Sequence, residues 1–180
     1  MGNDPLIKVT AATAAEVCQR FDMSREAREL LANGMGPWQF VETLASKKRY
    51  VEGIDFLAHA LPAREGVWWG CLCLQHASGD SLTPTERAAC VAAVRWVIQP
   101  TEENRVAAKA PADAAGMRTP AGALAMAANG GLPPQEPFAP AKAVAMAVKL
   151  ATLKSPPVAV METQRSYLQL GIGVAAGKFG

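Results

Sequence analysis

The sequence has few charged residues, few aromatic residues and few cysteines for its length of 180 residues. Charged residues make up 19% of it, aromatic residues 6%, and only four cysteines are present. The net charge of +2 comes from Lys and Arg scattered among Asp and Glu, so no basic patch forms and nucleic acid is not an expected partner. Four cysteines in a chain of this size do not form the dense framework of small secreted domains, so we expect reduced thiols.

Long apolar runs are missing as well. The longest candidate, residues 168–176, is glycine-interrupted and well short of the roughly 20 residues that cross a bilayer. The first 20 residues lack the apolar core of a signal peptide. We therefore expect no membrane span and a cytoplasmic protein. Hydrophobic residues make up 50% of the chain, which is typical of a globular domain.

Apolar residues recur with the 3.6-residue period of a helix, and strand-type alternation is convincing nowhere. The sequence predicts an all-α fold, either a compact multi-helix bundle or a helical-hairpin array with short loops. The predicted helices cover roughly residues 13–22, 24–32, 37–45, 50–61, 64–77, 83–99, 101–110, 119–128 and 141–154, with a last helix after residue 157.

The clearest local signal is Thr83-Pro84-Thr85-Glu86, a capping box with proline at the first helical position. We expect the helix that follows to face the core through Cys90, Val91, Val94, Val97 and Ile98. The preceding helix, residues 64–77, is apolar on nearly all sides, which predicts a buried central helix.

The length favours a single domain with two parts. Residues 1–11 are predicted to be disordered or extended, and residues 12–180 to form one helical domain. Within it, residues 12–110 hold most aromatic side chains. Residues 111–180 are alanine-rich and include a Pro/Gly loop near 129–140.

Two possible ligand sites fail on geometry. Cys71, Cys73 and His76 could bind zinc, but residues two apart on a helix point about 200° from each other, so both thiols cannot face one ion unless the helix breaks there. The glycines around Gly171 and Gly173, with Lys178, do not have phosphate-loop spacing and more plausibly mark close packing or fraying of the last helix. We expect no metal and no cofactor.

The densest group of functional side chain types is the stretch from His59 to Trp69. As a docking surface it would use Arg64, Glu65, Trp68 and Trp69, since arginine and tryptophan dominate protein interfaces. As an active site it would use His59 as a base and Glu65 as an acid, with Cys73 or Cys90 as a more distant option. As a structural corner, Pro62 would set the turn and the tryptophans would fill the core.

This stretch, together with the Thr83-Pro84 helix start and Trp96, resembles an uncharacterised bacterial family of domains of unknown function. The resemblance covers roughly residues 13–110, and the alanine-rich remainder matches only in composition. Members of that family look associated with type VI secretion genes, near spike-tip and effector-loading proteins. The resemblance implies an accessory or adaptor role, with a secretion effector or spike component as partner, and supplies no catalytic residues.

The sequence therefore favours a non-enzymatic helical adaptor or chaperone that binds another protein through the Arg64 to Trp69 corner or the C-terminal helices. One alternative is a small hydrolase or transferase that uses His59 and Glu65. Another is a structural subunit that oligomerises through its C-terminal helices.

Overall fold

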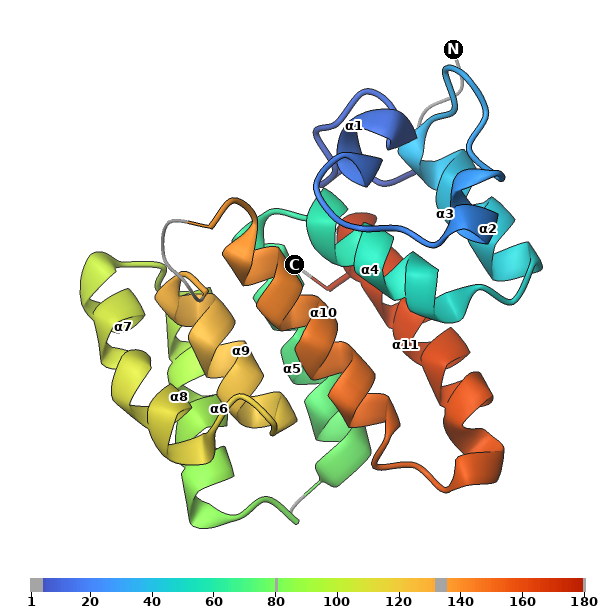
Figure 1. Cartoon of the computed structure of the whole chain (residues 1–180). Coiled ribbons are helices and arrows are strands. Elements are labelled where there is room, and N and C mark those ends of the chain that lie inside the picture. The colour runs from blue at the N-terminus through green and yellow to red at the C-terminus, as the bar shows by residue number, and fades with distance from the viewer. Residues whose placement is uncertain (1–4, 80, 132–135, 180) are drawn as a thin grey trace.

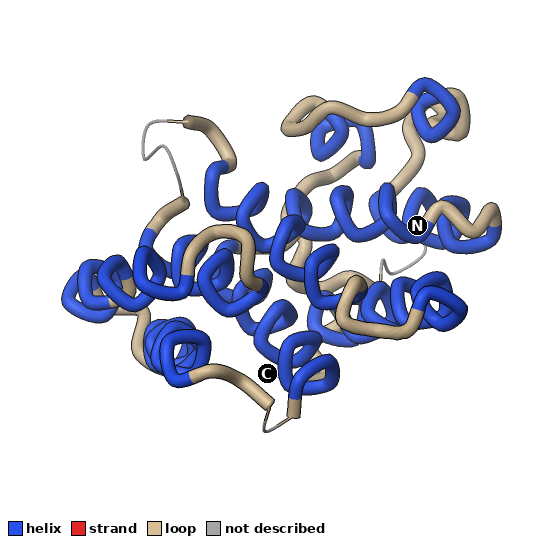
Figure 2. The backbone as a smooth tube through the Cα atoms, turned by 60° about the horizontal axis from the view of Figure 1, so that its bottom comes forward, coloured by secondary structure: helices blue, strands red, loops and turns tan. Residues whose placement is uncertain are grey.

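Helices joined by short turns make up the regular secondary structure of the described residues, which confirms the predicted all-α class (Figures 1 and 2). The structure, a computed structural model, describes residues 5–79, 81–131 and 136–179. The elements are α1 (Ala14–Cys18), α2 (Arg25–Arg28), α3 (Pro37–Ser46), α4 (Tyr50–Ala60), α5 (Ala63–Ser78), α6 (Pro84–Ile98), α7 (Glu102–Ala107), α8 (Lys109–Ala115), α9 (Pro120–Asn129), α10 (Ala139–Thr152), the 3-10 turn η1 (Pro157–Ala159) and α11 (Val160–Ala175).

The capping box predicted at the start of α6 is present. The Thr83 hydroxyl accepts from the backbone N–H of Glu86, and the Glu86 carboxylate accepts from the backbone N–H of Thr83 at 3.0 Å. Thr13 and Glu16 form half of a capping box at the start of α1. The Thr13 hydroxyl accepts from the backbone N–H of Glu16, but the Glu16 carboxylate accepts from the backbone N–H of Ala12 and from the Thr13 hydroxyl, not from the Thr13 backbone. Local capping therefore fixes both helix starts, as the sequence indicates.

Two predicted helix boundaries are wrong. The helix predicted before Pro111 is two helices, and Pro111 lies in the first turn of α8, where a missing N–H costs no intrahelical bond. The first helix, predicted to reach residue 22, ends at Cys18. Beyond it Arg20 donates to the carbonyl of His59 at 2.8 Å and Phe21 stacks on the His59 ring, so tertiary contacts replace the last helical turn.

The helix enclosed on all sides is α9, in the alanine-rich part, and not α5 as predicted. Every residue from Pro120 to Ala128 is buried, between α5, α6, α8 and α10. Helix α5 also packs against several helices, but Arg64, Gln75 and His76 on it are exposed. Alanine makes α9 thin, which lets four helices approach it closely.

The predicted core face of α6 is confirmed at Val97, partly buried at Cys90 and Val94, and wrong at Val91 and Ile98. The buried residues are Ala89, Ala93 and Val97, which lie on the face toward α9. Val91 and Ile98 are instead 52% and 68% exposed. Close packing against an alanine-rich helix selects the small side chains of α6, and the larger ones are left on the outer face.

Helix α11 packs against α4 and α5 through glycine. A Cβ atom added at Gly171 would lie 2.6 Å from both a Trp69 ring carbon and Leu57 Cδ2. The Trp69 indole is fully buried and donates to the carbonyl of Tyr167 at 2.8 Å. Close packing, one of the two explanations offered by the sequence, therefore accounts for this glycine.

The segment that precedes α1 packs against the end of α11. Leu6 is buried, and the backbone N–H of Lys8 donates to the carbonyl of Ala175 at 2.9 Å. Residues 1–4 of the predicted N-terminal segment and 132–135 of the predicted loop lie outside the described residues. Within the described ranges, no helix combines the length and apolar character needed to cross a membrane.

Candidate functional site

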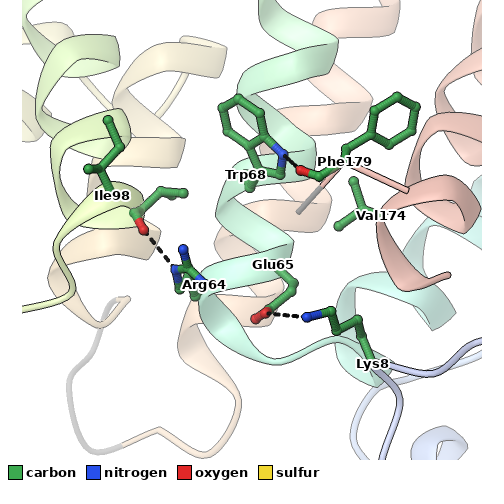
Figure 3. Close-up of a pocket in the computed structure, with 8 residues that line it drawn as sticks. Lys8, Arg64, Glu65, Trp68, Ile98, Val174 and Phe179 are labelled. Carbon is green, nitrogen blue, oxygen red and sulfur yellow. Dashed lines mark hydrogen bonds and ion pairs between the residues drawn. The ribbon is translucent and has the colours of Figure 1, made fainter. Parts of the chain in front are cut away.

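A pocket of about 270 Å³ opens at the start of α5, between the end of α6 and the end of α11 (Figure 3). Three of the four residues predicted to bind a partner, Arg64, Glu65 and Trp68, line it. The remaining lining residues come from three other segments of the chain: Lys8, Val97, Ile98, Val174 and Phe179. The walls are thus mainly apolar, with charged groups at the N-terminal end of α5.

One wall is built by the residues that follow α11. The backbone N–H of Gly177 donates to Val174, and that of Lys178 donates to Gly173 at 2.9 Å, as in a Schellman motif. Gly177 has φ +74°, a left-handed conformation that glycine adopts without strain. The turn brings Phe179 over Gly173, and the Phe179 carbonyl accepts from the Trp68 indole N–H at 2.9 Å (Figure 3).

The charged groups of the pocket are held by single contacts. Arg64 donates through Nε to the carbonyl of Val97 at 2.7 Å, which satisfies a carbonyl at the end of α6. Lys8 and Glu65 form a long ion pair with 4.0 Å between Nζ and Oε1. At this separation the pair is weak, so the half-exposed Lys8 ammonium and the Glu65 carboxylate can both exchange it for a ligand.

The apolar surface continues along the outer face of α6. A second hollow of about 350 Å³ is lined by Cys90, Val91, Val94, Arg95, Ile98 and Gln99. Ile98 lines both hollows, so they form one continuous surface. We call this surface, defined by the lining residues of the two hollows, the apolar groove. Three cationic side chains and one carboxylate lie among its lining residues.

Trp69, the fourth predicted binding residue, is in the core and does not line the groove. Trp68 and Trp69 are consecutive on α5 and therefore point about 100° apart. The sequence contained no local signal for Phe179, Val174 or Lys8, because these residues reach the groove only through contacts between distant segments.

The acid-base pair of the enzyme alternative is not assembled. His59 and Glu65 line different pockets, and no hydrogen bond or ion pair joins them in the described part of the chain. Glu65 faces Lys8, whereas the Nδ1 atom of His59 bonds to the carbonyl of Asp55 at 2.7 Å.

The cysteines differ strongly in their surroundings. A hydrogen bond from the Cys71 thiol lowers the pKa of Cys90 to about 7, with a further contribution from the charge of Arg87. Burial raises the pKa of Cys73 far above its usual value of 9.0. Cys90, which is half-buried and lines the groove, is therefore the cysteine best suited to react.

Helix α5 continues without a break through Cys71, Cys73 and His76, so the geometric argument against a zinc site there applies. Among the described residues no group of three or more His, Cys, Asp or Glu side chains could hold a metal ion.

A family model described as a family of unknown function (DUF6931) matches residues 40–175. The chain belongs to this family. The DUF6931 match begins within α3 and runs to the end of α11, so it includes the alanine-rich part that the resemblance above had left out. It therefore covers the α5 and α6 residues of the groove. No curated protein and no solved structure matches the chain.

Proposed function

We propose that this DUF6931 protein is a non-enzymatic accessory protein, an adaptor or chaperone, that binds an apolar segment of another protein in the apolar groove. The observation that carries the proposal is the outer face of α6. Large apolar side chains are exposed there beside a preformed pocket, although alanine would suffice for helix formation. Contiguous exposed apolar surface of this kind is characteristic of interaction sites.

The charges around the groove define the chemistry of the partner. Lys8, Arg64 and Arg95 outnumber Glu65, so a segment with acidic residues beside its apolar ones is complementary. The guanidinium of Arg64 keeps donors beyond the Nε–H that bonds to Val97, and these can hold a carboxylate. A second copy of this chain is less complementary, because its groove would present the same positive charges.

The exposed apolar surface of Ile98 sets the order of magnitude of the binding free energy that a partner could gain by covering it. Full burial of an isoleucine side chain contributes about 1.5–3 kcal/mol. Since Ile98 is 68% exposed, about two thirds of this, roughly 1–2 kcal/mol, is released only when a partner covers it. Loss of that contribution corresponds to about 5- to 30-fold in Kd.

A role in type VI secretion, with an effector or spike component as the bound protein, follows from the family resemblance and is part of this proposal. A cytoplasmic location belongs to the same proposal.

The test is selection of peptides from a random library on the immobilised protein, followed by titration calorimetry. We expect enriched peptides to combine large apolar residues with Asp or Glu. Ile98→Asp should weaken their binding at least about tenfold. Val158→Asp, which changes an apolar residue that is 96% exposed on η1, should leave binding unchanged. Peptides that bind both variants equally would refute the proposal.

A further inference from the structure

A second pocket, with a different chemistry, lies between the segment after α1, α4 and α10. Its volume is about 420 Å³, and no residue of the apolar groove lines it. We call it the His59 pocket. Its charged lining residues are Arg20, Asp22, Asp55, Lys142 and Lys149. A smaller apolar cavity of about 180 Å³ adjoins it and shares Arg20 and His59 with it.

The His59 ring is fixed in one orientation. Phe21 stacks on it with 4.7 Å between ring centroids, and Phe138 packs against it edge-on at 6.5 Å. Its Nδ1 atom lies 2.7 Å from the carbonyl oxygen of Asp55. A carbonyl can only accept a hydrogen bond, so Nδ1 carries the proton and the neutral ring presents a lone pair at Nε2.

This Nε2 atom has no partner. His59 is only 4% exposed, and Nε2 finds no hydrogen-bond donor within the described chain. Buried polar atoms in folded proteins are almost always paired, and each exception calls for an explanation. A donor from outside the chain would satisfy Nε2, and the ring lines the two adjoining cavities into which such a donor could enter.

Cationic groups surround the ring. Lys142 and Lys149 are close enough to influence its charge state, and Arg20 lies 5.4 Å from the Phe138 ring while donating to the carbonyl of His59. Lys149 pairs with Asp55 at 2.6 Å. Lys142 also pairs with Glu136, which does not line the pocket. Among the lining residues themselves, three cations stand against two carboxylates, an excess of one positive charge. It therefore suits a ligand that is anionic and also carries a hydrogen-bond donor.

A phosphomonoester combines both properties near neutral pH. Its second pKa is about 6, so about half of it at pH 6 and about a tenth at pH 7 retains one P–OH proton while the other oxygens carry negative charge. We propose that the His59 pocket binds the phosphoryl group of a small-molecule phosphomonoester, with the P–OH donating to Nε2 of His59 and the anionic oxygens facing Arg20 and Lys142. Sulfate has a similar shape and charge but no proton to donate.

In the proposed complex one proton lies in the hydrogen bond between the phosphate oxygen and Nε2 of His59, and either group can carry it. Burial lowers the pKa of free His59, so the proton enters with the phosphate or is taken up on binding. Affinity should therefore fall as pH rises above the second pKa of the ligand, by about tenfold per pH unit. The charged groups that face His59 in this process are Asp55 on α4, Lys142 and Lys149 on α10, and Arg20 and Asp22 after α1. Glu136, before α10, acts through its ion pair with Lys142.

The test is a titration of the intact protein with inorganic phosphate and with glycerol 3-phosphate, observed by NMR at the histidine ring signals. The chain has two histidines, so His76→Gln assigns the His59 signals directly. We expect saturable shifts of the His59 signals with both probes, binding at least about tenfold weaker for sulfate at the same ionic strength, and unmoved His76 signals.

Two pairs of variants separate a site from a general charge effect. Lys142→Ala should weaken phosphate binding several-fold, whereas Lys109→Ala, which removes a cation paired with Asp113 on α8, should not. His59→Asn keeps a donor for the Asp55 carbonyl but places no acceptor at the position of Nε2, so it should abolish the preference for phosphate over sulfate, with amide spectra reporting the fold. Equal binding of phosphate and sulfate, or phosphate binding unaffected by Lys142→Ala, would overturn the proposal. The apolar groove shares none of these residues, so failure of the phosphate proposal would leave the proposed protein-binding role of the groove untouched, and the reverse also holds.

Discussion

Alanine at Gly171 should destabilise the protein, whereas alanine at Gly66 should stabilise it. Both glycines are buried in helices, and both substitutions gain roughly 0.5–1 kcal/mol of backbone entropy and helix propensity. The added methyl groups meet different surroundings. At Gly66 the Cβ would lie 3.6 Å from Val144, an ordinary contact. At Gly171 it would lie 2.6 Å from the Trp69 ring, whose indole is held by its bond to Tyr167.

The overpacking at Gly171 should cost about 1–3 kcal/mol. Because the propensity gain is similar at both sites, this cost is also the expected difference in unfolding free energy between the two variants. It corresponds to about 2–4 °C in Tm for each kcal/mol in a domain of this size. Urea and thermal unfolding followed by circular dichroism measure the difference. A Gly171→Ala variant as stable as Gly66→Ala would refute the packing of α11 on α5 described above.

Three further predictions concern the two surfaces. Cys90 should react with a disulfide reagent at pH 7 faster than the other cysteines. Cys71→Ala should slow the reaction of Cys90, because it removes the hydrogen bond that lowers the pKa of Cys90. Equal rates for Cys90 in the wild-type protein and in Cys71→Ala would argue against that bond. Since burial lowers the folded-state pKa of His59 below its ordinary 6.5, the unfolded chain binds more protons below that pH, so stability should fall as pH decreases from 7 to 5. His59→Asn should flatten this part of the pH profile, and an unchanged slope would contradict the assignment. Ile98→Asp should cost no more than about 1–2 kcal/mol of stability beyond Val158→Asp, because about one third of Ile98 is buried and the new carboxylate lies at the C-terminus of α6; a loss above about 3 kcal/mol would mean that Ile98 belongs to the core.

Local signals in the sequence predicted much of this fold. The Thr83 cap, the proline at the start of α6 and the 3.6-residue period of α4 and α10 act over a few residues, so the sequence alone places these elements. The face that each helix buries depends on its neighbour. The sequence could not show that α6 would bury Ala89 and Ala93, because which face of α6 is buried depends on its close packing against the alanine-rich surface of α9.

The candidate site was predictable in part. Arg64, Glu65 and Trp68 stand out because they are charged or aromatic residues at a helix start. Trp69 is an aromatic residue in the same helical turn, so the sequence does not distinguish it from Trp68. Trp69 lies in the core because α11 approaches its ring closely at Gly171. Of the His59 pocket the sequence indicated only His59 itself, because Arg20 lies more than 100 residues before Lys142 and Lys149 and meets them only in the folded chain.

The most direct test of the central proposal is site-specific photo-crosslinking in the native host, with a benzophenone amino acid at position 98 and, as control, at position 158. The account predicts a discrete adduct with another protein from position 98 only, lost on Arg64→Ala substitution. Mass spectrometry should place the crosslink in an apolar segment that contains Asp or Glu. An adduct of two copies of this chain, or equal labelling from both positions, would contradict a groove that binds a partner protein.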